Sequence, residues 1–247
     1  MDRTSPCRQR ADLLLVELGL FESRAKAQAA IAAGLVTAGG VPVRKASEAL
    51  AVDADVTAAP AFPWVSRGGV KLEGALDRFG VAVAGRVCLD VGASTGGFAE
   101  VLIARGARRV YAVDVGTAQL HPRLRAEPRI VSLERTDIRA LDPARLSERP
   151  DFVTIDVSFI PLALVLPPAL ALAARPCHLL ALVKPQFEAP HACNRNGIVR
   201  DPAIRDQAVA RVAGHVAALG GRDAVMFPSA IAGGDGNLEH FIGAAFG

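Results

Sequence analysis

A glycine-rich turn is the part of this chain best suited to hold a nucleotide-type ligand. It reads Asp90-Val91-Gly92-Ala93-Ser94-Thr95-Gly96-Gly97-Phe98. A short apolar run, 87–89, precedes the turn, and a helical pattern of apolar residues follows it. Glycines let the backbone approach a ligand closely, and the N-terminus of the following helix offers unpaired N–H groups. A second apolar run, 110–113, ends in Asp114, where an acid binds a ribose diol in a βαβ unit.

The spacing of these glycines indicates which ligand is bound. The turn lacks the G-x-G-x-x-G pattern of dinucleotide sites, and the chain contains no G-x-x-x-x-G-K-[ST] phosphate loop. A D-x-G-x-x-x-G turn followed by an acid-tipped strand resembles the S-adenosyl-L-methionine site of doubly wound methyltransferases. The competing interpretation is a plain strand–turn–helix whose glycines serve packing. The residues assigned to the cofactor are Asp90, Gly92, Ala93, Ser94, Thr95, Gly96, Gly97, Phe98, Asp114, Val115, Asp137 and Asp156.

Four charged residues outside the turn are candidates for catalysis. Lys71 follows a glycine-rich lead into a helix, and Glu239 lies at the edge of the last expected strand. Asp156 and Lys184 each end an apolar strand. Ligands of open α/β sheets bind beyond the carboxyl ends of the strands, so these charges are expected over a cofactor. Taken singly, each is equally a solvated end of an element.

The pattern of elements that must position these residues predicts an α/β fold. From residue 87 onward, apolar strands alternate with helical stretches, as in a mostly parallel sheet. Expected strands are 87–91, 110–113, 130–134, 152–155, 178–183, 224–227 and 238–243. Expected helices are 97–105, 161–174 and 202–219. The sequence therefore predicts a Rossmann-like, seven-stranded domain over 66–247, joined by a linker at 60–65 to a small α+β domain at 1–59.

The small domain resembles a known RNA-binding module. The pattern R-x-D-x-L-L-V-E-L-G-L-x-E-S-R-x-x-A-Q-x-x-I-x-x-G-x-V, residues 10–36, is similar to the S4 domain, named after a small-subunit ribosomal protein. That family presents basic residues to structured RNA, and phosphate contacts need Arg and Lys on one face. The competing interpretation is an ordinary solvated helix face. The residues expected to contact RNA are Arg8, Arg10, Ser23, Arg24, Lys26, Lys45 and, in the larger domain, Arg67.

The order Lys71, Asp156, Lys184, Glu239 resembles the Lys-Asp-Lys-Glu tetrad of FtsJ-type RNA 2′-O-methyltransferases. With the S4-like module in front, residues 10–242 resemble the TlyA family, whose members methylate ribosomal RNA ribose and often carry the name hemolysin. The supporting strings are Ser66-Arg67-Gly68-Gly69, the turn at 90–98, Asp114-Val115-Gly116, Asp156-Val157-Ser158-Phe159-Ile160, Lys184-Pro185-Gln186-Phe187-Glu188 and Gly197-Ile198-Val199-Arg200-Asp201-Pro202.

The resemblance implies a role for each tetrad residue and a substrate. Lys184 is expected to act as base toward a ribose 2′-hydroxyl, with Asp156 and Glu239 orienting it and Lys71 balancing charge. The implied cofactor is S-adenosyl-L-methionine, and the implied partner is ribosomal RNA or a ribosomal subunit, with cytidine as the target. Three departures put cofactor contacts in doubt. Glu100 replaces the usual Asp, Thr117 replaces an expected aromatic or polar residue, and Asp137 stands where Asn is common.

Composition limits the alternatives. With 51% hydrophobic and 21% charged residues over 247 positions, the chain is globular, and its net charge of +3 names no partner. The longest apolar run, 157–174, is interrupted by prolines and favours a core helix over a membrane span. Without an apolar leader or C-x-x-C pairs, we expect a cytoplasmic protein with reduced thiols, no metal and no membrane partner. The oligomeric state is not fixed by the sequence, and a monomer is the working expectation.

Two other functions remain open at this point. One is a membrane-active hemolysin, which requires a spanning or amphipathic membrane segment. The other is a ribosome-assembly protein that binds RNA and keeps the cofactor fold without catalysis. Which RNA and which nucleotide are recognised does not follow from the sequence, because specificity depends on the shape of folded RNA.

Overall fold

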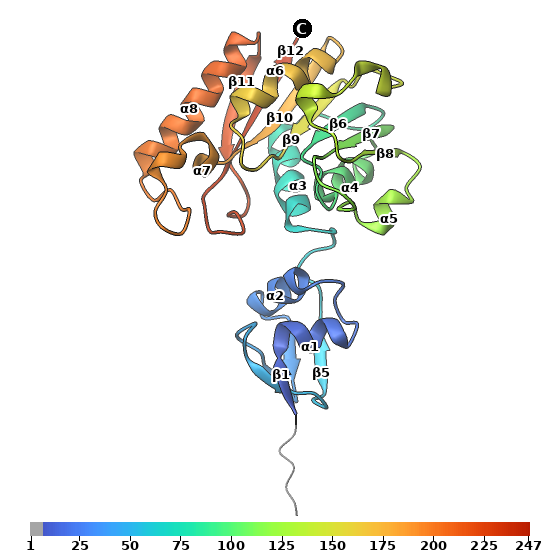
Figure 1. The fold of residues 1–247 in the computed structure, drawn as a ribbon, viewed down its shortest axis with the longest axis vertical. Coiled ribbons are helices and arrows are strands. Elements are labelled where there is room, and N and C mark those ends of the chain that lie inside the picture. The colour runs from blue at the N-terminus through green and yellow to red at the C-terminus, as the bar shows by residue number, and fades with distance from the viewer. Residues whose placement is uncertain (1–6) are drawn as a thin grey trace, which may run out of the picture. The chain divides into compact units, whose positions relative to one another are not determined.

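The computed structural model describes residues 7–247 and divides the chain into two compact units, Met1–Pro63 and Trp64–Gly247 (Figure 1). Residues 1–6 of the first expected domain lie outside the described part. Trp64 and Val65, which we assigned to the linker, pack against the core of the larger unit. The indole Nε1 of Trp64 donates a hydrogen bond of 3.1 Å to Glu73 in the same unit.

The smaller unit packs two helices against short strands. Helices α1 (Ala11–Glu17) and α2 (Arg24–Ala32) carry the buried side chains of its core. Ser23 ends the turn before α2 by accepting a hydrogen bond from the Lys26 N–H at 3.3 Å, as an N-cap does. The strands are β1 (Arg8–Arg10), β2 (Val36–Ala38), β3 (Val41–Pro42), β4 (Ala49–Ala51) and β5 (Val56–Ala58). They form a β1–β4 pair and a β3–β2–β5 sheet, both antiparallel.

The larger unit contains the expected seven-stranded sheet. Its strands are β6 (Val87–Val91), β7 (Arg109–Val113), β8 (Ile130–Leu133), β9 (Phe152–Ile155), β10 (Cys177–Val183), β11 (Arg222–Pro228) and β12 (His240–Phe246). Their order across the sheet is β11-β12-β10-β9-β6-β7-β8. Strands β6 to β10 pair in parallel, and β12 runs antiparallel to both of its neighbours. The central strands are near-continuous apolar runs because both faces of the sheet are covered.

Helices cover both faces of this sheet (Figure 1). Alternate residues of one strand point to opposite sides, so Leu89 belongs to one core cluster and Cys88 to the other. Helices α6 (Leu162–Leu172) and α8 (Pro202–Ala218) pack on the first cluster, and α3 (Arg67–Phe79), α4 (Gly97–Ala104) and α5 (Pro122–Arg125) pack on the second. A one-turn helix, α7 (Pro185–Glu188), follows β10.

The expected last strand, 238–243, begins and ends later in the structure. Strand β12 starts at His240, because the preceding segment is a loop held by the side chain of Asn237. Glu239 therefore lies immediately before the strand rather than at its edge. The last strand then continues to Phe246, whose ring is buried in the core.

Candidate active site

The glycine-rich turn lies where β6, β7 and β9 end together. Gly92 has φ +83° and its N–H donates to Val113 O at 2.8 Å, so the turn is tied to the neighbouring strand. A Cβ at this position would overlap the carbonyl oxygen of Asp156 and lie 3.2 Å from Val157 Cγ1. The close approach therefore requires glycine on both conformational and steric grounds.

The second half of the turn packs inside the protein. A Cβ on Gly96 would overlap Leu124 and lie 2.7 Å from Leu120 Cδ1. A Cβ on Gly97 would overlap Ser66 and lie 2.9 Å from the Gly69 nitrogen. These glycines let α4 begin against α3 and α5, which is the packing role that the competing interpretation predicted. Phe98, another residue assigned to the cofactor, is buried in the same core cluster.

Asp114, at the end of β7, is held by the backbone of two turns. Its Oδ2 accepts from the Ser94 N–H at 2.8 Å, and its Oδ1 accepts from the Gly116 N–H at 2.7 Å. Beside it lies a cavity of about 730 Å³. The lining residues are Val91, Gly92, Ser94, Val113, Asp114, Val115, Gln119, Thr136, Asp137, Ile138, Arg139, Asp156, Val157, Ser158, Phe159, Ile160, Pro161, Leu164 and Val165. Six of the residues assigned to the cofactor are in this set: Gly92, Ser94, Asp114, Val115, Asp137 and Asp156.

Four of these lining residues, Ile138, Val157, Leu164 and Val165, form an apolar wall that the sequence analysis did not identify. Three come from the segments just after β9 and from α6, where they looked like ordinary core positions. Asp137 lines the cavity, but its carboxylate also pairs with Arg139 at 2.6 Å, and this pairing lowers the pKa of Asp137.

Asp90 occupies a different place from the other assigned residues. It is completely buried beneath the turn, and its Oδ1 accepts from the Thr154 hydroxyl at 2.9 Å, whereas its Oδ2 has no partner. Burial raises the pKa of Asp90 to about 7. The side chain supports the turn from inside and does not line the cavity. Ala93 and Thr95 are also outside the lining set.

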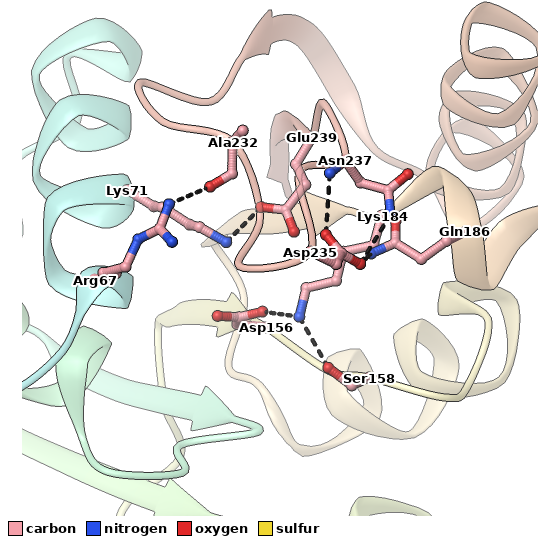
Figure 2. Close-up of polar contacts among 10 residues, drawn as sticks. All are labelled: Arg67, Lys71, Asp156, Ser158, Lys184, Gln186, Ala232, Asp235, Asn237 and Glu239. Atoms are coloured by element: carbon pink, nitrogen blue, oxygen red, sulfur yellow. Dashed lines mark hydrogen bonds and ion pairs between the residues drawn. The ribbon is translucent and has the colours of Figure 1, made fainter. Parts of the chain in front are cut away.

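The structure brings the four charged candidates together as two ion pairs (Figure 2). Lys184 Nζ lies 2.6 Å from Asp156 Oδ1 and donates to Ser158 Oγ at 3.0 Å. Lys71, on the inner face of α3, pairs with Glu239. Each pair joins two different elements, so the sheet and α3 must both be in place to build the site. Asp156 and Ser158 line the cavity, which places the Lys184 ammonium at its edge.

The two pairs act on one another electrostatically. Burial raises the pKa of Glu239, and the positive charges of Lys71 and Lys184 oppose that rise. The carboxylate of Asp156 adds to the rise. Charge at any one of the other three residues therefore changes the proton affinity of Glu239, so the four groups are electrostatically coupled.

A network of two buried amides and an exposed carboxylate lies next to the ion pairs, and the sequence analysis missed it (Figure 2). Asp235 accepts from the amides of Gln186 at 3.1 Å and Asn237 at 2.8 Å. Asn237, fully buried, also accepts from the Val199 N–H at 3.0 Å and donates to Gly197 O at 2.9 Å. The network ties the loop that carries Lys184 to the loop that carries Glu239. The string Gly236-Asn237-Leu238-Glu239 was the available signal, but only its acid was used.

An exposed aromatic side chain next to Ser158 was also missed as a site residue. Phe159 is 90% exposed and has φ +65°, an uncommon conformation for a non-glycine residue. Its ring lies 5.0 Å from the ring of Phe187, and Lys184 Nζ lies 5.9 Å from that second ring. An exposed, conformationally strained aromatic at the mouth of a cavity is a feature associated with functional sites.

In the smaller unit, the structure gives two of the expected RNA-binding arginines a structural partner. The carboxylate of Asp12 is fully buried and accepts from Arg10 at 3.0 Å, Arg24 at 2.9 Å and Gln28 at 2.8 Å. The hydrogen bond from Arg10 lowers the pKa of Asp12, with further help from Gln28 and Arg24. Lys26 pairs with Glu22 at 2.6 Å. These contacts fix the basic side chains in one arrangement while reducing their net charge.

The remaining expected RNA-binding residues lie at the surface. Arg8 donates to Ala49 O at 2.7 Å, and Lys45 is exposed after the β2–β3 hairpin. Arg67, in the larger unit, donates to Ala232 O at 2.8 Å, close to the ion pairs (Figure 2). Ser23 acts as the helix cap described above, so a structural role accounts for it.

Two family models match the chain. The model of the FtsJ-like methyltransferase covers residues 64–246, and the model of the S4 domain covers residues 9–56. The fold and the site thus define a methyltransferase of the FtsJ type that carries an S4 domain. The FtsJ-like fold implies S-adenosyl-L-methionine as the methyl donor.

Individual relatives narrow this class. A Mycobacterium tuberculosis protein named 16S/23S rRNA (cytidine-2'-O)-methyltransferase TlyA is 45% identical over 95% of this chain and 89% of its own length. Hemolysin A of Brachyspira hyodysenteriae is 35% identical over 94% of this chain and 99% of its own length. A solved structure named as a hemolysin, from Streptococcus thermophilus, has a TM-score of 0.77 and 38% identity, covering 98% of this chain and 89% of that one. The chain belongs to the TlyA family.

The hemolysin names raise the question of a membrane-crossing segment. Within residues 7–247, the structure contains no helix with the length and apolar character needed to span a bilayer. The apolar run at 157–174 that we expected to form a core helix contains α6, which packs on the sheet.

Proposed function

We propose that this protein transfers a methyl group from S-adenosyl-L-methionine to the 2′-hydroxyl of a cytidine in ribosomal RNA. The observation that carries the proposal is the Lys184–Asp156 ion pair, 2.6 Å long, at the edge of a cavity that Asp156 itself lines. A basic side chain is thereby fixed beside the expected methyl donor. The name of the M. tuberculosis relative, which specifies cytidine 2′-O-methylation of 16S and 23S rRNA, supports the choice of substrate.

The described residues fit the proposed cofactor. Both Asp114 oxygens already accept backbone N–H groups, but a carboxylate has about four acceptor sites, which leaves room for ribose hydroxyls. Ile138, Leu164 and Val165 supply an apolar surface for the adenine ring. Gly92 leaves the space that a side chain would fill at the end of β6. We assign Asp137 to the adenine amino group. Its carboxylate would then accept hydrogen bonds from both that group and Arg139.

The chemistry requires positioning and one proton transfer. When bound, the cofactor would supply the 2′-oxygen with a methyl group already activated by a positively charged sulfonium, and would leave as a neutral thioether. Lys184, in its neutral amine form, accepts the proton of the 2′-hydroxyl. Asp156 orients Lys184 through their ion pair, Glu239 acts on Lys184 through its charge, and Lys71 keeps the charge of Glu239 compensated within the site.

The S4 domain supports RNA as the substrate class. We assign basic residues of this domain to phosphates of folded ribosomal RNA. Arg8 and Lys45 are exposed and not engaged with Asp12, whereas Lys26 is partly buried and would have to share its charge with Glu22. Arg67 extends this role to the larger unit. A ribosomal substrate also places the working protein in the cytoplasm, and a monomer is sufficient because each proposed catalytic residue comes from the same chain.

Methyl incorporation tests the proposal directly. Small and large ribosomal subunits from a strain lacking this gene are incubated with the protein and cofactor carrying a tritiated methyl group, and the RNA is digested to nucleosides. We expect label in 2′-O-methylcytidine. Label on a base, or binding of RNA without incorporation, would contradict the proposal, and the second result is what a non-catalytic assembly protein predicts. Leakage of lipid vesicles under the same conditions would favour the membrane-active alternative.

A further inference from the structure

We propose that a second pocket on the larger unit binds a phosphate of the RNA backbone. This inference rests on the proposed function and adds a contact surface to it. The pocket has a volume of about 440 Å³ and lies beside β8, which is an edge strand of the sheet. Its lining residues are Thr117, Ala118, Arg125, Ser132, Glu134, Arg135 and Arg145.

The charge of this pocket is strongly positive. Three arginines, Arg125, Arg135 and Arg145, face one carboxylate, that of Glu134. The Glu134 oxygens accept three backbone N–H groups at 2.8 to 3.0 Å, which lower its pKa and hold it against the wall. The three guanidinium groups make no ion pair with a carboxylate in the part of the chain that the structure describes. Two positive charges are therefore in excess.

Two arginines near the pocket residues in the sequence are ion-paired, which sets the pocket apart. Arg129 pairs with Glu127 at 2.9 Å, and Arg139 pairs with Asp137 at 2.6 Å. In the pocket, by contrast, the hydrogen bond that Arg125 donates within residues 7–247 goes to the carbonyl of Leu120, at 3.0 Å. Unpaired guanidinium charge is thus concentrated at one place on this edge.

The chemistry of the lining favours a phosphodiester as ligand. Guanidinium groups bind phosphate oxygens through paired, charge-assisted hydrogen bonds. The hydroxyls of Thr117 and Ser132 add neutral donors. The lining contains no aromatic side chain on which a base could stack. A backbone phosphate satisfies all of these groups.

The pocket is also fixed relative to the cofactor cavity. Arg135 has φ +52°, and its N–H donates to Gly116 O at 2.9 Å, next to the Asp114 turn. The next two residues, Thr136 and Asp137, line the cavity. In addition, Arg145 donates to the Thr136 hydroxyl at 3.1 Å. A phosphate held here would be positioned by the same segment that forms a wall of the cofactor cavity, and would help to set the register of the RNA strand.

The test measures binding of the full chain to protein-free ribosomal RNA from a strain lacking the gene, at salt concentrations between about 50 and 200 mM. The variant Arg125→Gln/Arg135→Gln removes two pocket charges and leaves Arg145, which contacts a cavity residue, unchanged. Arg129→Gln is the matched control, because it removes the same type of charge from the same edge but from an ion-paired arginine.

We expect the affinity of the pocket variant for RNA at about 100 mM salt to be lower by about tenfold or more. The slope of log affinity against log salt concentration should become shallower by the equivalent of about one to two phosphate contacts. The control should bind within about twofold of the original protein, and calorimetric affinity for the cofactor should be unchanged in all three. Equal RNA binding by pocket variant and control would overturn the inference. So would a loss seen with intact subunits but not with protein-free RNA, because it would assign the pocket to an acidic protein segment.

Failure of this inference is distinguishable from failure of the proposed function. If the original protein labels no ribosomal RNA ribose, the proposed function is wrong whatever the pocket binds. If it labels RNA while pocket variant and control bind alike, the proposed function stands and the pocket inference is wrong.

Discussion

Lys184 pairs with Asp156 across the ends of two adjacent parallel strands, with Nζ and Oδ1 2.6 Å apart. Its other contact is the Ser158 hydroxyl, and it makes no ion pair with Glu239, which pairs with Lys71 instead. The arrangement means that the lysine nearest the cofactor cavity is oriented by a residue of the cavity wall. The second pair, Lys71–Glu239, joins α3 to the loop before β12 and adds one positive and one negative charge to the cluster.

Gly92→Ala is expected to abolish cofactor binding. The added Cβ would overlap Asp156 O at a backbone φ of +83°. Gly80→Ala is the matched control, because Gly80 also has positive φ, +71°, but an added Cβ meets nothing within 4 Å. Both variants carry a similar backbone cost, and only the first has the clash. Calorimetric titration with cofactor checks the difference, and equal affinities in the two variants would refute the assignment of the turn.

Asp90 is expected to make the stability of the larger unit depend on pH. Burial raises its pKa in the folded protein to about 7, from an ordinary value of 3.8, so the folded state binds the proton more tightly than the unfolded state. The contribution of protonated Asp90 to the free energy of unfolding is complete below about pH 4 and is lost as pH rises through 7. The loss is on the order of a few kcal/mol.

Asp90→Asn should remove this dependence, because the amide carries no charge at either pH. Thermal unfolding at pH 5 and pH 8 measures the effect. The melting temperature of the original protein should fall more between these values than that of the variant. Parallel changes in the two proteins would mean that Asp90 is not the titrating group.

Asn237→Ala is expected to slow turnover more than it weakens substrate binding. The change removes the buried amide that holds Asp235 and joins the loop before Glu239 to Val199 and Gly197, so the Lys71–Glu239 pair loses its support. We expect kcat to fall about tenfold or more, with KM and cofactor affinity nearly unchanged. Asn194→Ala, which removes bonds of 2.9 and 3.0 Å within the neighbouring loop, is the control. If Asn237 had a purely structural role, kcat would fall to the same extent in both variants, and the pH profile of activity would be unaltered.

Asp12→Ala is expected to destabilise the S4 unit and to reduce RNA affinity indirectly. The buried carboxylate holds Arg10 and Arg24, whose side chains remain about half exposed and can be hydrated when it is lost. The cost is therefore about 1–3 kcal/mol rather than that of a fully buried charge. Denaturant unfolding measures it. For the same reason, RNA contacts are better tested at Lys45, because reversing Arg24 would place a second acid against Asp12.

The sequence analysis predicted the fold well because its signals are local. The apolar runs that became β6, β9 and β10 are each bounded by a charge or glycine, and the parallel order follows from the alternating helices. The four charged candidates were singled out from residue type, from position beside expected strands and a helix, and from the order that resembles the FtsJ-type tetrad; their catalytic role stays a prediction. The ion pairs could not be predicted from the sequence, because nothing in the spacing of Lys71, Asp156 and Lys184 indicates which lysine pairs with which acid.

Other features depend on contacts between segments far apart in the chain. Gly96 and Gly97 look like ligand-binding glycines in the sequence, and their packing against α5 and α3 appears only when those helices are in place. The arginine pocket likewise joins α5 to the segment after β8. Asp12 fits the helix pattern of its own segment, and its burial under Arg10 follows from tertiary structure alone.

The central claim is that Lys184 accepts the proton of the ribose hydroxyl, and single-turnover methylation of ribosomal subunits by Lys184→Arg tests it most directly. Arginine keeps the positive charge and the ability to pair with Asp156, but it does not deprotonate near neutral pH. The account predicts unchanged cofactor and RNA binding with a methylation rate about 10²–10⁴-fold lower. A rate close to that of the original protein would contradict it, and would leave positioning of the two substrates as the whole of catalysis.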